Sequence, residues 1–126
     1  DLRARYQVII LSDTFYEFAD PLMRQLGRPT LFCHRLVVDG DGRVRDYKLR
    51  QPDQKRAAVN ALKSLNYRVM AAGDSYNDTG MLLAADAGFF IHAPPAIAAQ
   101  CPQFPATRSY AELTTAIDGA ATALRA

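Results

Sequence analysis

The chain has 126 residues, 49% of them hydrophobic, so it is long enough to bury a core and too short for two ordinary domains. Its 15 basic and 13 acidic residues are scattered and give a formal net charge of +2, which argues against the concentrated positive surface that nucleic-acid binding needs. The apolar runs are too short to span a membrane, and Cys33 and Cys101 lack the spacing of a zinc site. We therefore expect a soluble, cytoplasmic protein that binds neither nucleic acid nor membrane.

Short apolar runs alternate with helical patterns along the chain. The runs at 8–11, 69–72 and 89–91 are continuous, as expected for parallel strands that are covered on both faces. Residues 1–5 lack a starting methionine and read as the end of a polar helix that leads into the first strand. We expect residues 1–126 to be the C-terminal part of a single core domain, with an α/β fold built on an incomplete, doubly wound parallel sheet.

Helices are predicted between and after these strands. Apolar residues recur every three or four positions from Phe15 to Leu26, and the pattern ends at Gly27. Asp20-Pro21 interrupts this pattern and predicts a kink or a restart of the helix. Further helices are expected at 53–64, at 78–85 and from Ser109 onward, where the serine hydroxyl can cap the helix.

The segment 31–49 departs from the alternation of strand and helix. Two strand-like runs flank Asp39-Gly40-Asp41-Gly42, which has the residue types of a tight turn. The sequence therefore predicts a β-hairpin inserted into the α/β pattern.

Polar residues follow the first strand and open the second predicted helix, and open α/β sheets bind ligands beyond the carboxyl ends of their strands. Ser12-Asp13-Thr14 offers a hydroxyl and successive amides that suit a phosphoryl oxygen, although by itself a helix cap is the simpler interpretation. Lys55 lies in the first turn of a predicted helix, where the macrodipole disfavours a cation. Its ammonium is a candidate to neutralise a phosphoryl group, with a solvated charge near Asp53 as the alternative.

The run Gly73-Asp74-Ser75-Tyr76-Asn77-Asp78 is the most specific of these features. It places two carboxylates and an amide directly after a buried strand, and hard oxygen ligands of this kind suit Mg²⁺. An Asx turn or a helix cap accounts for Asn77 or Asp78 but gives Asp74 no role. Asp74 is therefore the candidate metal ligand.

The order of these residues resembles motifs two, three and four of the haloacid dehalogenase superfamily. Ser12 after a strand, Lys55 at a helix start and the run 73–78 after the next strand carry the resemblance. It is closest to the phosphoserine phosphatases, in the ThrH-type branch that also transfers phosphate to homoserine, where Asp13-Thr14 replaces the glycines common in other members. Almost the whole chain takes part, through segments 8–18, 21–27, 71–79 and 102–106.

The resemblance implies an Mg²⁺-dependent enzyme that acts through an aspartyl-phosphate, with phosphoserine as donor and water or homoserine as acceptor. It implies that Lys55 and Asp78 are catalytic: Lys55 balances the charge of nucleophile and phosphate, and Asp78 orients Lys55 or a metal-bound water. It assigns Mg²⁺ binding to Asp74. It assigns phosphate or substrate binding to Ser12, Asp13, Thr14, Lys55 and Asn77.

Motif one of that family, an apolar strand followed by Asp-x-Asp, should precede these residues and is not found, so we expect residues 1–126 alone to be inactive. Asp39-Gly40-Asp41 has the spacing but the wrong place in the motif order, and we interpret it as a hairpin turn. His34 and His92 are interpreted as structural, with a place lining the ligand cleft as the alternative for His92. A catalytically inactive module that binds metal or phosphate remains an alternative, and a nucleotide-binding or receiver-like domain is a weaker one because no Gly-x-Gly-x-x-Gly is present.

Overall fold

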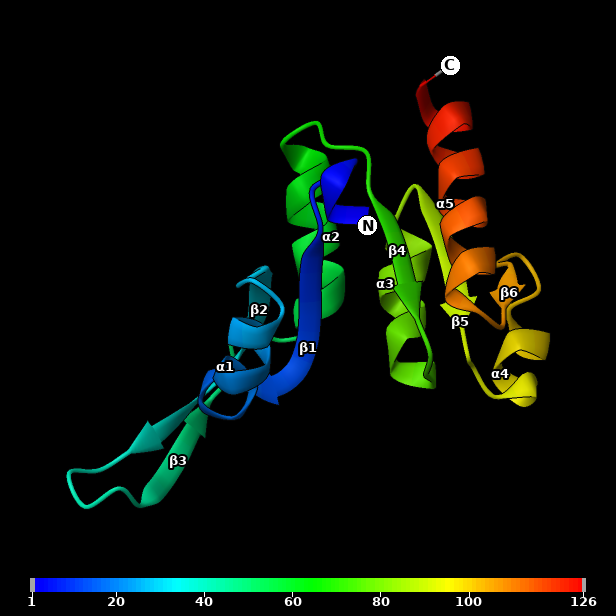
Figure 1. The fold of residues 1–126 in the computed structure, drawn as a ribbon. Coiled ribbons are helices and arrows are strands. Elements are labelled where there is room, and N and C mark those ends of the chain that lie inside the picture. The colour runs from blue at the N-terminus through cyan, green and yellow to red at the C-terminus, as the bar shows by residue number, and fades with distance from the viewer. Residues whose placement is uncertain (1, 126) are drawn as a thin grey trace. The chain divides into compact units, whose positions relative to one another are not determined.

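The computed structural model describes residues 2–125, and the chain divides into two compact units at the peptide between Gln54 and Lys55. Figure 1 shows the elements of each unit. Both units combine parallel strands with helices, which confirms the predicted α/β class. None of the helices within residues 2–125 is long and apolar enough to cross a bilayer.

The first unit contains a parallel pair of strands and a hairpin. After a short 3-10 helix (Leu2–Ala4), β1 (Ile9–Phe15) leads into α1 (Tyr16–Gln25), and the chain returns through β2 (Thr30–Val38) and β3 (Val44–Lys48). The first half of β2 runs parallel to β1, and its second half pairs antiparallel with β3. The predicted hairpin is confirmed, and its first strand is also the parallel partner of β1.

Asp39 closes the hairpin turn with its own side chain. Its Oδ1 accepts hydrogen bonds from the backbone N–H groups of Asp41 at 2.9 Å and Arg43 at 3.0 Å, while Oδ2 accepts one from the guanidinium of Arg45. Gly42 adopts a φ of +80°, the left-handed conformation that glycine tolerates best. The backbone N–H of Arg43 and the Arg45 side chain are the main causes that lower the pKa of Asp39. The carboxylate therefore holds the turn, as the turn interpretation predicts.

Helix α1 runs through Pro21 without a break, so the predicted restart at that position is wrong. Proline there removes only the N–H that would donate to the carbonyl of Glu17, and both residues are exposed, so solvent can take its place. The predicted end at Gly27 is confirmed. Gly27 has a φ of +78°, and the N–H of Arg28 donates to the carbonyl of Met23 at 2.8 Å, which is a Schellman-type ending.

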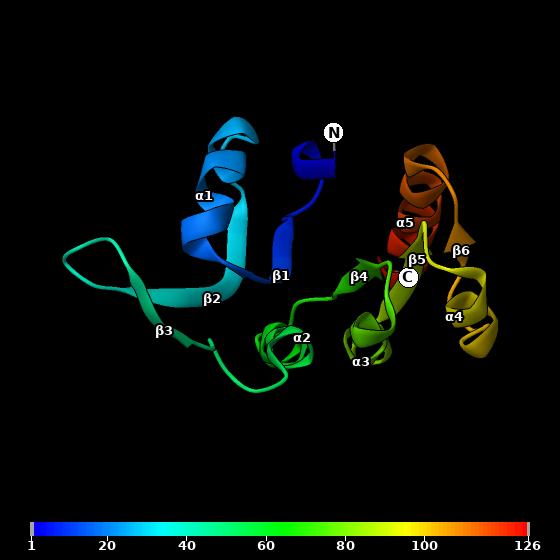
Figure 2. The same cartoon turned by 90° about the horizontal axis from the view of Figure 1, so that it is seen from below.

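The second unit is built on a parallel sheet with the order β4-β5-β6. Its strands are β4 (Met70–Gly73), β5 (Ala87–Ile91) and β6 (Ala106–Thr107). Its helices are α2 (Gln54–Ser64), which starts at the unit boundary, the 3-10 helix η2 (Tyr76–Asp78), α3 (Thr79–Ala84), α4 (Pro95–Gln100) and α5 (Tyr110–Arg125). Figure 2 shows α5 on one face of this sheet and α3 on the other, the arrangement of a doubly wound sheet.

The core of the second unit lies between this sheet and its helices. Phe90 and Leu82 are almost fully buried, and the rings of Phe90 and Phe104 meet edge to face with centroids 5.8 Å apart. From α5, Leu113 and Ile117 are buried. This packed core fixes the ends of β4 and β5. In such folds the loops after the strands bind ligands, and a rigid support positions their side chains precisely.

Candidate functional site

The predicted site residues fall into two groups, one in each unit. The first unit contains Ser12, Asp13 and Thr14, and the second contains Lys55, Asp74, Asn77 and Asp78. The structure brings residues together within each group.

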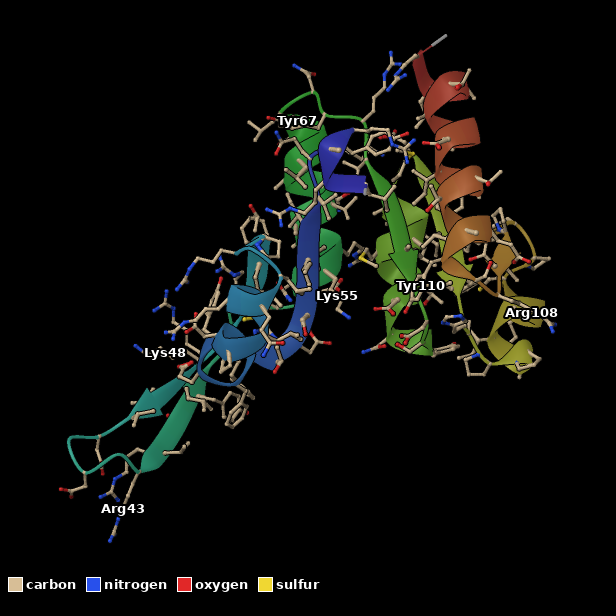
Figure 3. All side chains as sticks on the ribbon, in the orientation of Figure 1. Arg43, Lys48, Lys55, Tyr67, Arg108 and Tyr110 are labelled. Carbon is tan, nitrogen blue, oxygen red and sulfur yellow. The ribbon has the colours of Figure 1, made fainter. Side chains whose placement is uncertain are left out.

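Asp78 is the centre of the second group. Its side chain is 6% exposed, and its Oδ1 accepts a hydrogen bond of 2.7 Å from the Lys55 ammonium, which extends from the first turn of α2 (Figure 3). Its Oδ2 accepts bonds from the backbone N–H groups of Asp74 at 3.1 Å and Ser75 at 3.3 Å, and from the Ser75 hydroxyl at 3.1 Å. A carboxylate held by an ammonium, two amides and a hydroxyl is satisfied as an anion.

Opposing effects act on the pKa of Asp78. Burial would raise the pKa, but the hydrogen bond and positive charge of Lys55 outweigh it, with help from the N–H of Asp74 and the hydroxyl of Ser75. The net result is a pKa below the ordinary value of an aspartate. Asp78 therefore stays ionised, and Lys55 keeps its partner, through the neutral pH range.

This lowered pKa predicts a specific loss of stability in acid. Because the folded state favours the Asp78 carboxylate, its contribution is present above the ordinary aspartate pKa of about 4 and disappears as the pH falls through the lower folded value. Urea unfolding at about pH 6 and about pH 3 should show that Asp78→Asn loses less stability over this interval than the wild type. Equal pH dependence of wild type and Asp78→Asn would contradict the assignment.

Gly73 ends β4 against the Asp78 carboxylate. A Cβ on Gly73 would lie 2.6 Å from the Cβ and 2.7 Å from the Oδ2 of Asp78, closer than real contacts allow. Ser75 and Asp78 cap the 3-10 helix η2 reciprocally as a capping box. The helix-cap interpretation of Asp78 thus holds for η2 rather than for the next helix, α3, where Asp78 makes no side-chain cap bond.

Asp74 and Asn77 lie on the exposed side of this turn. The Asp74 carboxylate is exposed directly after β4, and the Ser75 hydroxyl shares its one hydrogen between the Asn77 side-chain oxygen and the Asp78 carboxylate. Within residues 2–125 no three His, Cys, Asp or Glu side chains are grouped to hold a metal. Mg²⁺ takes one or two carboxylates and completes its shell with water and phosphate oxygens, so Asp74 fits as one such ligand.

In the first unit, Ser12-Asp13-Thr14 forms a bulge in β1. Leu11 pairs with Phe32, but the next paired residue, Phe15, lies opposite His34, so three residues of β1 face one of β2. The strand continues to Phe15, and α1 starts without a side-chain cap. The helix-cap interpretation of this segment is therefore wrong, because the pairing resumes before the helix begins.

The bulge presents the Ser12 hydroxyl as a hydrogen-bond donor. Its oxygen accepts the backbone N–H of Thr14 at 3.2 Å, which leaves the hydroxyl hydrogen to point elsewhere. A hydroxyl held in this way suits a phosphoryl oxygen, as the sequence interpretation proposed.

His34 has a carboxylate partner that sequence reasoning missed. The ring is buried, its Nδ1 accepts the backbone N–H of Arg50 at 3.0 Å, and its Nε2 lies 3.4 Å from the Oδ1 of Asp13. The Arg50 bond places the ring hydrogen of neutral His34 on Nε2, facing Asp13. No spacing in the sequence signals this pair, because it depends on the bulge in β1.

His92 contacts residues that follow the strands of the β4-β5-β6 sheet. It follows β5 and has a φ of +52°. Its Nε2 lies 2.9 Å from the carbonyl oxygen of Arg108, and the centroids of its ring and of the Tyr110 ring are 5.4 Å apart. Arg108 and Tyr110 are labelled in Figure 3. These contacts join the loops after β5 and β6, which agrees with the structural interpretation of this histidine.

The fold and the second group define an α/β protein with an ammonium–carboxylate pair and an exposed aspartate at the carboxyl edge of a parallel sheet. A profile described as haloacid dehalogenase-like hydrolase matches residues 1–86, and the chain belongs to this family. The family resemblance seen in the sequence is thereby confirmed.

Curated relatives and solved structures agree with this membership. A protein named phosphoserine phosphatase from Pseudomonas syringae pv. tomato is 62% identical over 89% of this chain and 47% of its own length. Phosphoserine phosphatase ThrH from Pseudomonas aeruginosa is 62% identical over 89% of this chain and 55% of its own. The chain thus spans about half the length of these relatives. A crystal structure of phosphoserine phosphatase in apo form has the same fold, with a TM-score of 0.71 and 21% identity over 90% of this chain and 60% of that one.

Proposed function

We propose that residues 1–126 supply the phosphate-neutralising part of a phosphoserine phosphatase that acts through an aspartyl-phosphate and uses water or homoserine as acceptor. The observation that carries this proposal is the ion pair between the half-buried Lys55 and the buried Asp78, with an Nζ–Oδ1 distance of 2.7 Å, beside the exposed Asp74. The names of the 62% identical relatives support the choice of phosphoserine. The substrates are small molecules, and the two free cysteines suit a cytoplasmic location.

Each residue has a role that its contacts support. Asp78 accepts one hydrogen of the Lys55 ammonium and fixes its direction, and the ammonium has three hydrogens to donate. Lys55 then balances negative charge on the phosphoryl group, the main task in phosphoryl transfer. As the family resemblance implies, Ser12, Asp13, Thr14 and Asn77 contribute polar groups to phosphate or substrate. Mg²⁺ at Asp74 would supply further positive charge to the phosphoryl oxygens.

The nucleophile is proposed to lie on a segment other than residues 1–126. Asp39 has the motif-one spacing, but its carboxylate is engaged with Asp41, Arg43 and Arg45 in the hairpin turn. An in-line attack on phosphorus needs a carboxylate that is positioned at the reacting group. By this proposal, residues 1–126 by themselves do not hydrolyse phosphoserine.

Replacement of Asp74 tests this proposal against the hairpin aspartate. In the whole enzyme that contains this chain, Asp74→Ala should lower the rate of phosphate release from phosphoserine by about 100-fold and weaken its dependence on Mg²⁺. Asp39→Ala, the matched control, should change the rate by less than about 3-fold, because it loosens only an exposed turn. Phosphate release is measured over a series of Mg²⁺ concentrations. The reverse order of the two effects would show that the hairpin carries the chemistry.

A catalytically inactive module that binds phosphate or metal is the second candidate. The same observation favours it, because an ammonium fixed by a buried carboxylate binds phosphate whether or not a nucleophile is nearby. The two candidates differ in the turnover of the whole protein that contains this chain: an inactive module binds inorganic phosphate but releases none from phosphoserine at any Mg²⁺ concentration.

A further inference from the structure

The bulge in β1 interrupts the hydrogen bonds between β1 and β2, and a side chain replaces them. Gln54, the first residue of α2 and the last of the first unit, donates from its Nε2 to the carbonyl of Ser12 at 2.7 Å and, more weakly, to that of Phe32 at 3.4 Å. These carbonyls lie on the two paired strands where the regular register ends after Leu11. Gln54 therefore takes the place of the missing backbone donor at the start of the bulge.

The orientation of the Gln54 amide follows from its surroundings. Gln54 is 3% exposed, and rotating the amide by half a turn would put its oxygen against two carbonyl oxygens. In the observed orientation its Oε1 is buried, and no donor among residues 2–125 reaches it. Asp53, just before it, has a φ of +50°, an unfavourable conformation for a residue other than glycine.

The buried Gln54 Oε1 and the positive φ of Asp53 both lower the stability of the fold. A buried acceptor without a donor weakens the fold, and an apolar side chain of the same length would fill the space without that loss. What glutamine provides and an apolar residue does not is the hydrogen bond to the Ser12 carbonyl. Because Ser12 and its neighbours have left the strand pairing, this bond anchors the serine backbone to Gln54.

We infer that Gln54 is a positioning residue for the phosphate-binding hydroxyl: it holds the Ser12 carbonyl and so sets the direction of the Ser12 side chain. The inference rests on the proposed function, in which the Ser12 hydroxyl binds the phosphoryl group. Gln54 itself touches no substrate. Its effect on phosphate passes through Ser12, which makes it measurable as a coupling between the two residues.

A double-mutant cycle tests this coupling in the whole enzyme. With the wild-type serine, Gln54→Met should weaken inhibition by inorganic phosphate and raise the KM for phosphoserine about tenfold, as loss of one oriented hydrogen bond does. In the Ser12→Ala background the same replacement should change both by less than about twofold, because the hydroxyl it positions is gone. Gln51→Met, at an exposed neighbouring position, is the control and should have no effect in either background. Equal losses in both backgrounds would overturn the inference.

Gln54→Glu gives an independent readout through pH. The acid can donate to the Ser12 carbonyl only when protonated, and burial beside two carbonyl oxygens favours the protonated form. Relative to the wild type at each pH, phosphate inhibition of Gln54→Glu should be near normal in acid and become progressively weaker as the pH rises. A constant ratio at every pH would contradict a donor role for this side chain.

Failure of the inference and failure of the proposed function give different results. If the wild type releases no phosphate from phosphoserine, the proposed function is wrong. In that case, hydrogen exchange of the Thr14 amide, which donates to the Ser12 hydroxyl oxygen, still tests whether Gln54 holds the bulge. Gln54→Met should speed that exchange at least tenfold more than Gln51→Met does, and unchanged exchange would show that Gln54 does not hold the bulge.

Discussion

In the whole enzyme that contains this chain, replacing Lys55 by Met is expected to lower the free energy of unfolding by about 3 kcal/mol and, on the proposed function, the rate of phosphoserine hydrolysis by about 1000-fold. Methionine keeps the length of the side chain but leaves the Asp78 carboxylate, 6% exposed, without its ammonium partner. Removing one member of a buried pair is costly because the remaining charge is no longer compensated. Urea unfolding and phosphate release measure the two effects in the same preparation.

The double replacement Lys55→Met with Asp78→Asn separates stability from activity. The new asparagine side chain would retain an oxygen to accept the N–H groups of Asp74 and Ser75, and it leaves no buried charge, so most of the lost stability should return. Activity should stay low because the ammonium is absent. Lys63→Met is the matched control, since Lys63 lies on the same helix with its side chain 39% exposed and should cost less than about 1 kcal/mol. A Lys55→Met loss no larger than that of Lys63→Met would contradict the importance of the pair.

Replacing Gly73 by Ala is the second change with a large expected effect. The new Cβ would lie 2.6 Å from the Cβ of Asp78, and neither atom is the flexible end of a side chain, so the backbone or the carboxylate must move. Overpacking of this kind costs about 1–3 kcal/mol, and the displaced carboxylate would also release Lys55. In the whole enzyme, the free energy of unfolding and, on the proposed function, the phosphatase rate should both fall.

Gly119 provides the matched control for this change. It lies within α5, and a Cβ added there meets no atom within 4 Å. Gly119→Ala should therefore stabilise the protein by about 0.5–1 kcal/mol, because alanine favours the helical conformation. If Gly73→Ala were equally stabilising, the close packing of Asp78 on the end of β4 would not hold in solution.

The sequence predicted the elements that have a strong local pattern. The continuous apolar runs became β1, β4 and β5, the Asp-Gly turn became a hairpin, and Ser109 accepts the N–H of Glu112 at 3.1 Å as the cap of α5. The Lys55–Asp78 contact was implied by family resemblance, since the two residues are 23 positions apart. Each of these features is set by residues that are close together in the sequence or by the order of the family's motifs.

Features that depend on tertiary contact were not predicted. The bulge at residues 12–14 follows from the way β2 pairs with β1, and both Gln54 and the His34–Asp13 contact acquire their roles from that bulge. Helix α4 and strand β6 had no prediction, because β6 has only the two residues Ala106 and Thr107 and gains its identity from pairing with β5. Such elements have no periodicity of their own to detect.

The hairpin formed by the second half of β2 and by β3 has a practical consequence for protein engineering. Its turn is closed by bonds that Asp39 makes to residues no more than six positions away, and every residue of β3 is exposed. A tip that is held by local bonds and contributes nothing to the buried core can accept foreign sequence, since loop length adds little to the entropy of closure. An insertion between Gly40 and Asp41 would interrupt only these local bonds, so this peptide is the natural position for an epitope or a fluorophore attachment site.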